Sequence, residues 1–140
     1  MKDNIFLDTN MFVYLYSEDE PLKQAVVEEI INYIKPIISI QVLNELSNTL
    51  RKKFQKEFDE IENVIDEISE NCTIEIIDEL TVRSALAIAK KYKYHYYDSL
   101  IIASALENNC SILYSEDMQD GQIIEKRLKI VNPFSSVHKE

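Results

Sequence analysis

The sequence predicts an α/β fold in which a mainly parallel β-sheet carries helices on both faces. Short apolar runs rich in β-branched residues alternate with longer segments whose apolar residues recur at helical spacing. The chain has one Gly and three Pro, so we expect short turns rather than flexible linkers between these segments. Because 46% of its 140 residues are hydrophobic, residues 1–140 are expected to form a single domain around one core.

Five short apolar segments are expected to form the strands. Each is too short for a helix and is bounded by polar or turn-forming residues. The segment "PIISI" is also rich in β-branched side chains, which favour a pleated strand. The predicted strands are residues 4–8, 36–40, 73–77, 111–115 and 128–131.

The segments between these strands are expected to be helical. A turn at Thr9 and Asn10 follows the first strand, and Pro21 is suited to a first helical position further on. The apolar residues after Pro21 repeat every four positions, at Leu22, Val26, Ile30 and Ile34. Further helices are predicted over residues 41–54, 81–92 and 98–109.

One more amphipathic helix is predicted around residues 61–68. Its apolar stripe follows the i, i+3, i+4, i+7 pattern at Ile61, Val64, Ile65 and Ile68. Its acids are expected to face water, where they only solvate the surface: Asp59, Glu60, Glu62, Asp66, Glu67 and Glu70.

The charge distribution bears on the choice of partner. A formal net charge of -10 disfavours nucleic acid, because phosphate binding is driven by Lys and Arg. The bases nevertheless gather in two runs, "RKKFQK" and "KKYKYHYY". Arg51, Lys52 and Lys91 in these runs are candidates for contacting RNA, and a solvated helix face is the equally open alternative.

Several features indicate a cytoplasmic protein. No apolar run approaches the roughly 20 residues needed to cross a bilayer. The N-terminal "MKDNIFLDTN" has acids where a secretion signal needs an apolar core. Cys72 and Cys110 lie far apart in no paired motif, so we expect buried free thiols in a reducing compartment rather than a zinc site.

The predicted topology directs four acids to one edge of the sheet. Asp8 ends the first strand, and Asp117 follows strand 111–115. Glu45 lies in the first turns of the helix after the second strand, and Asp98 begins the helix before strand 111–115. In such folds the functional crevice lies beyond the carboxyl ends of the strands. A helix cap for Asp98 and a solvated helix face for Glu45 are the structural alternatives.

Gathering four carboxylates has a cost that a cation would offset. Like charges a few Å apart raise each other's pKa and destabilise the fold. Oxygen ligands without His or Cys point to Mg²⁺ or Mn²⁺, and His95 and His138 lie outside the predicted cluster. Two divalent ions offset all four charges, so that an acidic protein is able to accept a phosphodiester and hydrolyse it at the metal.

Taken in series, these motifs resemble the PIN-domain family, and within it the VapC-type toxins of type II toxin–antitoxin pairs. The similarity runs from "FLDTNMFVY" through "ISIQVLNEL" and "YYDSLIIASAL" to "LYSEDMQDGQIIEKRLKIVNPF". It implies a three-layer α/β/α sandwich and a Mg²⁺-dependent endoribonuclease, with Mn²⁺ as a substitute ion. The acidic quartet that it implies, both catalytic and metal-binding, is Asp8, Glu45, Asp98 and Asp117.

The resemblance also implies supporting residues. Thr9 and Ser115 match the family's small hydroxyl residues, which orient a carboxylate or water, and Asn10 belongs to the same motif. Glu116 and Asp120 flank Asp117. A supporting contact to the metal, direct or through water, and an exposed surface charge are both open for these two acids.

The partners that the resemblance implies are an RNA substrate, a cognate antitoxin that blocks the cleft, and a second toxin copy in a homodimer. A tRNA or another structured RNA is a candidate substrate. The alternative is a non-catalytic PIN domain that binds RNA or a protein without cutting, although retention of all four acids argues against it. A receiver domain is disfavoured, because it needs adjacent acids after the first strand and a Lys after a late strand.

Overall fold

The computed structural model describes residues 4–135, and His138 lies outside them. In this range a six-stranded sheet has the order β3-β2-β1-β4-β6-β5. All neighbouring strands are parallel except β5, which runs antiparallel to β6. The strands are β1 (Ile5–Leu7), β2 (Ile37–Ser39), β3 (Thr73–Glu75), β4 (Ile112–Tyr114), β5 (Ile123–Ile124) and β6 (Leu128–Val131). The predicted mainly parallel sheet is confirmed.

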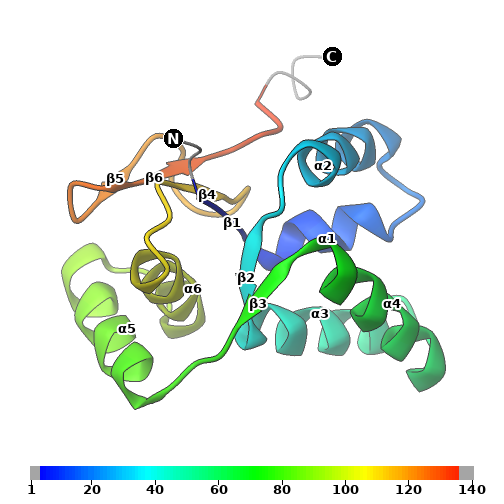
Figure 1. Ribbon diagram of the computed structural model, residues 1–140, viewed down its shortest axis with the longest axis horizontal. Coiled ribbons are helices and arrows are strands. Elements are labelled where there is room, and N and C mark those ends of the chain that lie inside the picture. Colours follow the sequence, from blue (N-terminus) through cyan, green and yellow to red (C-terminus); the bar gives the residue numbers. More distant parts are fainter. Residues whose placement is uncertain (1–3, 136–140) are drawn as a thin grey trace.

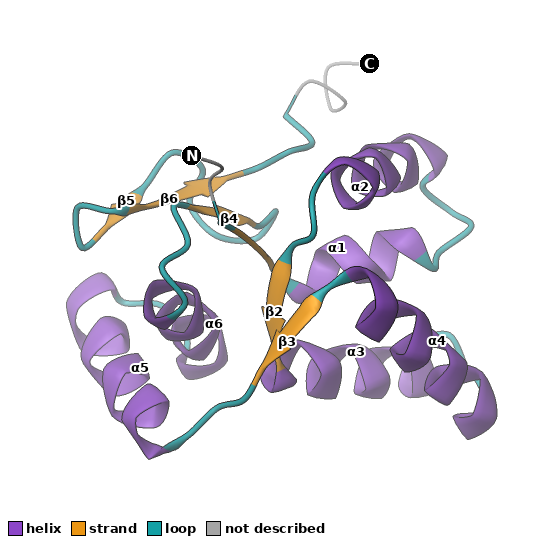
Figure 2. Cartoon of the chain, in the orientation of Figure 1, coloured by secondary structure: helices purple, strands orange, loops and turns teal. Residues whose placement is uncertain are grey.

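Helices lie on both faces of this sheet. Figure 1 shows α5 and α6 on one side and α1, α2 and α4 on the other, and Figure 2 shows the strands between them. The helix α3 begins where β2 ends and packs against α1 and α4. The helices are α1 (Thr9–Leu15), α2 (Pro21–Tyr33), α3 (Ile40–Lys52), α4 (Phe58–Asn71), α5 (Glu79–Tyr92) and α6 (Tyr96–Glu107). The α/β/α sandwich expected from the family resemblance is therefore confirmed.

The predicted turn at Thr9 and Asn10 is wrong, because α1 begins at Thr9. Asp8 is the N-cap of this helix, and its carboxylate accepts a hydrogen bond from the Thr9 N–H. Met11 and Phe12 are fully buried, so packing into the core stabilises a helix of only seven residues. The same aspartate thus ends a strand and starts a helix.

Two further predictions need correction. The two-residue strand β5 was not predicted, since so short a segment carries no periodic pattern. The helix α6 starts at Tyr96 with His95 in the N-cap position, so Asp98 lies inside the first turn rather than at the start. This placement matters for the choice between a cap and a ligand.

Burial follows the layers. Residues 99–106 of α6 are all buried, because this helix lies between α5 and the sheet. The six acids of α4 are exposed, as predicted. Cys72 and Cys110 are buried free cysteines, as predicted, and burial raises the pKa of each thiol to about 12. Over residues 4–135, no helix is both long enough and apolar enough to cross a membrane.

Candidate acidic metal site

The pairing of β1 with β4 brings the first two site residues together. The Asp8 N–H donates to the carbonyl of Tyr114, the last residue of β4, at 3.0 Å, which extends the ladder one residue beyond β1. The Ser115 Oγ donates to Asp8 Oδ2 at 2.8 Å, and the Thr9 N–H donates to Asp8 Oδ1 at 2.7 Å. Asp8 is only 4% exposed. Both of its carboxylate oxygens are therefore held in place by neighbouring donors.

The helix α3 brings Glu45 to the same edge. The Thr9 Oγ1 donates to Glu45 Oε1 at 2.9 Å, and the Gln41 Nε2 donates to Glu45 Oε2 at 2.9 Å. Glu45 is half-buried, at the boundary position that its helical phase predicts. Gln41 was missed as a site residue, although its i, i+4 spacing to Glu45 is the signal that identifies it.

Asp98 reaches the cluster from α6. It is half-buried, and the helix has no side-chain hydrogen bond at its N-cap. Burial raises the pKa of Asp98, and the negative charges of Glu45 and Asp117 raise it further, while His95 acts in the opposite direction. Asp98 is therefore not the N-cap of α6. His95, expected to lie outside the cluster, is close enough to act on this carboxylate.

Asp117 completes the group from the loop after β4. Its Oδ2 accepts a hydrogen bond from the Asn10 side-chain amide of α1. The supporting residues Thr9, Asn10 and Ser115 thus contact three members of the quartet, namely Glu45, Asp117 and Asp8 respectively.

The quartet is a cluster of acids whose negative charges raise the pKa of Asp8 and of Asp98. Burial raises the pKa of Asp8 to about 7, although the hydrogen bonds from Ser115 and Thr9 oppose this shift, and the charges of Asp98 and Glu45 add to it. In the part of the chain that the structure describes, no member of the quartet forms an ion pair with Lys or Arg. Within these residues the fold therefore collects the acids without an ion pair to Lys or Arg.

The chemistry of this donor set fits a hard divalent cation. Carboxylate oxygens without sulfur or imidazole ligands suit Mg²⁺ and Mn²⁺, and their net charge favours such an ion. Between residues 4 and 135, no three His, Cys, Asp or Glu side chains are already arranged to hold a metal. The oxygens of Asp8, Glu45 and Asp117 are instead bound by the neighbouring donors. The metal ligands stay a prediction.

The two acids that flank Asp117 have other partners. Glu116 pairs with Lys23 at 2.6 Å, and its side chain is 16% exposed, so it is not a surface charge. Asp120 is exposed, and its Oδ1 accepts a hydrogen bond from the Asn132 N–H at 2.8 Å. Lys23 was missed at the sequence level, because no local pattern links it to a residue 93 positions away.

The predicted RNA-contacting bases lie at the surface. Arg51 and Lys52 are exposed in the last turn of α3, roughly 9 to 11 Å along the helix axis from Glu45. Arg51 also donates to the Lys56 carbonyl at 3.1 Å. Lys91 is exposed and pairs with Glu125 at 2.7 Å. Their contact with RNA stays a prediction.

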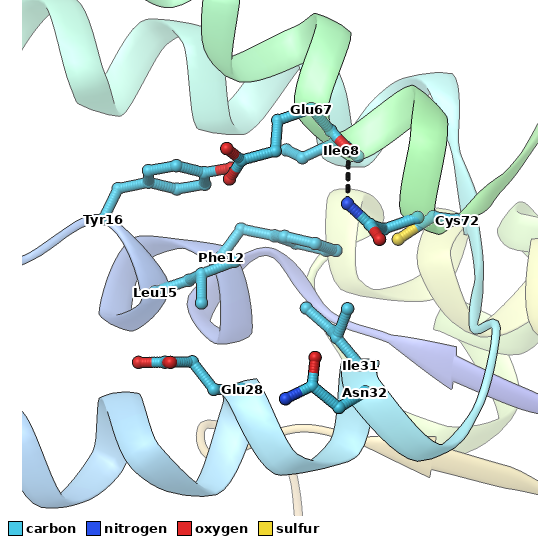
Figure 3. Close-up of a pocket in the computed structure, with 10 residues that line it drawn as sticks. Phe12, Leu15, Tyr16, Glu28, Ile31, Asn32, Glu67, Ile68 and Cys72 are labelled. Atoms are coloured by element: carbon cyan, nitrogen blue, oxygen red, sulfur yellow. Dashed lines mark hydrogen bonds between the residues drawn. The ribbon is translucent and has the colours of Figure 1, made fainter.

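A separate cavity of about 310 Å³ lies among α1, α2 and α4 (Figure 3). Phe12, Leu15 and Ile31 provide apolar walls, and the Tyr16 hydroxyl donates to Glu67 at 2.6 Å. No member of the quartet lines this cavity. The cavity is therefore distinct from the site formed by the quartet.

Known protein structures share the fold described above. A sequence comparison with curated proteins finds no match. A toxin–antitoxin complex from Klebsiella pneumoniae contains a chain of similar structure, with a TM-score of 0.69 and 19% identity over 93% of this chain and 97% of that chain. The Mycobacterium tuberculosis toxin VapC20, described as cleaving the sarcin-ricin loop, has a TM-score of 0.69 and 15% identity over 81% and 90% of the two chains.

A third similar structure is VapBC2 from Rickettsia felis, bound to a fragment of promoter DNA. It has a TM-score of 0.67 and 18% identity over 90% of this chain and 96% of that chain. At these identities the likeness concerns the fold. The PIN-domain family model matches residues 5–123, a range that contains all four acids. The chain therefore belongs to the PIN-domain family.

Proposed function

We propose that this protein is a Mg²⁺-dependent endoribonuclease that acts in the cytoplasm as the toxin of a type II toxin–antitoxin pair. One observation carries the proposal: Asp8, Glu45, Asp98 and Asp117 come from separate parts of the chain and form one charged cluster that has no Lys or Arg ion pair within residues 4–135. A fold tolerates such repulsion where a function requires it.

The quartet would hold Mg²⁺, with Mn²⁺ as a substitute. A bound divalent ion supplies Lewis acidity, which withdraws charge from a phosphate group and makes water more acidic. The protein's own contribution is to hold the carboxylates. Ser115 and the Thr9 N–H hold Asp8, the Thr9 hydroxyl and Gln41 hold Glu45, and Asn10 holds Asp117. Such outer contacts restrict the carboxylate rotamers and so reduce the entropy lost when an ion binds.

The biological role is supported by family membership and by the similar structures, which include VapC20 and two toxin–antitoxin assemblies. We propose a cognate antitoxin as the partner that covers the acidic edge, and a homodimer as the toxin's assembly. A tRNA or another structured RNA is the proposed substrate. The exposed Arg51 and Lys52 would approach its phosphates from the same helix that carries Glu45.

The test is incubation of purified, antitoxin-free protein with total cellular RNA, with Mg²⁺ and with EDTA, followed by end mapping. Discrete Mg²⁺-dependent cut sites are expected, and Asp98→Asn should remove them. Wild-type protein that binds the ion and RNA without cutting would contradict the proposal and favour a non-catalytic binding module.

A further inference from the structure

A largely buried ion pair adjoins the acidic quartet. Lys23 of α2 places its Nζ 2.6 Å from Glu116 Oε2, and the two side chains are 11% and 16% exposed. Glu116 directly precedes Asp117 in the loop after β4. A base therefore neutralises one acid of this loop, while its neighbour belongs to the quartet, which has no Lys or Arg ion pair among the described residues.

Aromatic rings surround this pair. The Lys23 Nζ lies 4.6 Å from the centroid of the Tyr14 ring and 5.5 Å from that of Phe134. The Tyr14 hydroxyl donates to Glu116, and the Lys23 Nζ donates to the Tyr14 hydroxyl at 3.3 Å. Tyr14 and Phe134 pack edge to face, with their centroids 5.2 Å apart. The ammonium group is thus fixed by a carboxylate, a hydroxyl and two ring faces.

The helix α1 holds the loop at two successive points. Asn10 donates to Asp117, and Tyr14, one turn later on the same helix, donates to Glu116. The two consecutive acids are therefore held in different directions. Asp117 is held near the other three acids of the quartet, and Glu116 is held towards Lys23.

We propose that Lys23 is a positioning residue for the acidic site: by retaining Glu116, it sets the conformation of the loop that presents Asp117 to the other three acids of the quartet. Without Lys23, Glu116 would keep a charge at a largely buried position after losing its ion pair with this lysine. The carboxylate would then turn towards water and carry the adjacent Asp117 away from Asn10. The metal part of this inference rests on the proposed function.

The experiment compares wild type, Lys23→Met and the double variant Lys23→Met/Glu116→Gln in the full chain. Both replacements keep the approximate length of the side chain and remove its charge. Mn²⁺ titration calorimetry should show roughly tenfold weaker binding for Lys23→Met, the lower end of the range for loss of a residue that orients a ligand. The double variant should regain most of this affinity, because the carboxylate that lost its ion pair with Lys23 is then replaced by a neutral amide.

A second readout uses no metal and no RNA. The ¹⁵N resonance of the Asn10 side-chain amide reports its hydrogen bond to Asp117. It should shift in Lys23→Met and return towards the wild-type position in the double variant. Arg83→Met is the matched control, because Arg83 forms an exposed ion pair with Glu79 on α5 and should change neither readout.

Wild-type Mn²⁺ affinity and an unshifted Asn10 amide in Lys23→Met would overturn the inference, even if the variant melts earlier. A double variant as weak as the single one would also overturn it, because Lys23 would then not act through Glu116. If wild type binds no Mn²⁺ and cuts no RNA, the proposed function fails, and the amide shifts still decide whether Lys23 positions Asp117.

Discussion

The acidic surface of α4 and the acidic quartet carry the same chemical group in opposite environments. On α4 the six acids are exposed to solvent. In the quartet, Asp8 is 4% exposed and Asp98 is half-buried, and burial is the largest cause of the raised pKa of both. The comparison teaches that burial of Asp8 and Asp98 beside other acids, rather than the number of acids, separates the quartet from the solvated face of α4.

The largest expected effect separates the two regions by activity. Asp98→Asn should lower the rate of RNA cleavage by roughly 10²- to 10³-fold, the range for removing one electrostatic group from an active site. The matched change on α4, Asp66→Asn, should leave the rate unchanged. Cleavage of an end-labelled RNA at saturating Mg²⁺ measures both, and circular dichroism verifies that both variants are folded. Equal rates for the two variants would remove the functional distinction between the regions.

The second prediction concerns stability and pH. Folding raises the pKa of Asp8 from 3.8 to about 7, so its contribution to stability is full below pH 4 and is lost as the pH rises towards 7. In metal-free urea titrations, wild type should therefore lose stability relative to Asp8→Asn by on the order of 3 kcal/mol between pH 4 and pH 8. A difference that does not change with pH would mean that folding does not raise the pKa of Asp8. Asp66→Asn should give such a flat difference.

The third prediction concerns added metal. Mg²⁺ should raise the free energy of unfolding of wild type at pH 7.5, by about 2.7 kcal/mol when its concentration is 100 times the Kd. The Asp66→Asn control should respond like wild type, whereas Asp98→Asn should respond much less. Calorimetric melting with Mg²⁺ and with EDTA measures the difference. A full response in Asp98→Asn would place the ion somewhere other than the quartet.

The smallest expected effect concerns the bases of α3. Charge reversal at Arg51 or Lys52 should weaken RNA binding and reduce the slope of log affinity against log salt by about 1. Glu62→Lys on α4 is the control, because a base added on this face is not expected to contact the RNA. An unchanged slope for the α3 variants would return these bases to the solvated face.

The parts of the fold that the sequence predicts are those with a local signal. The strand at residues 4–8 ends in polar residues, and the stripe from Ile61 to Ile68 has a clear helical period. Such patterns order the strands and helices along the chain. The order then directs Asp8, Glu45, Asp98 and Asp117 to one edge, because the carboxyl ends of parallel strands meet there.

The parts that were missed depend on contacts distant in sequence or on very short elements. The helix α1 is stabilised by the Asp8 cap and by burial of Phe12, so its sequence resembles a turn until the core is known. The partner of Glu116 is Lys23, and nothing near either residue identifies the other. Local patterns therefore predict which acids lie close together. They do not predict that Glu116 forms an ion pair with Lys23.

The two buried cysteines have a practical consequence. The thiolate is the reactive form, and a pKa of about 12 leaves roughly one thiol in 10⁵ ionised at pH 7. Alkylation of the native protein therefore requires the structure around each thiol to open. Cys72 would report opening where α4 meets β3, and Cys110 would report opening between α6 and β4. The rates at which the two thiols are labelled give separate measures of local unfolding in two parts of the molecule, without any introduced probe.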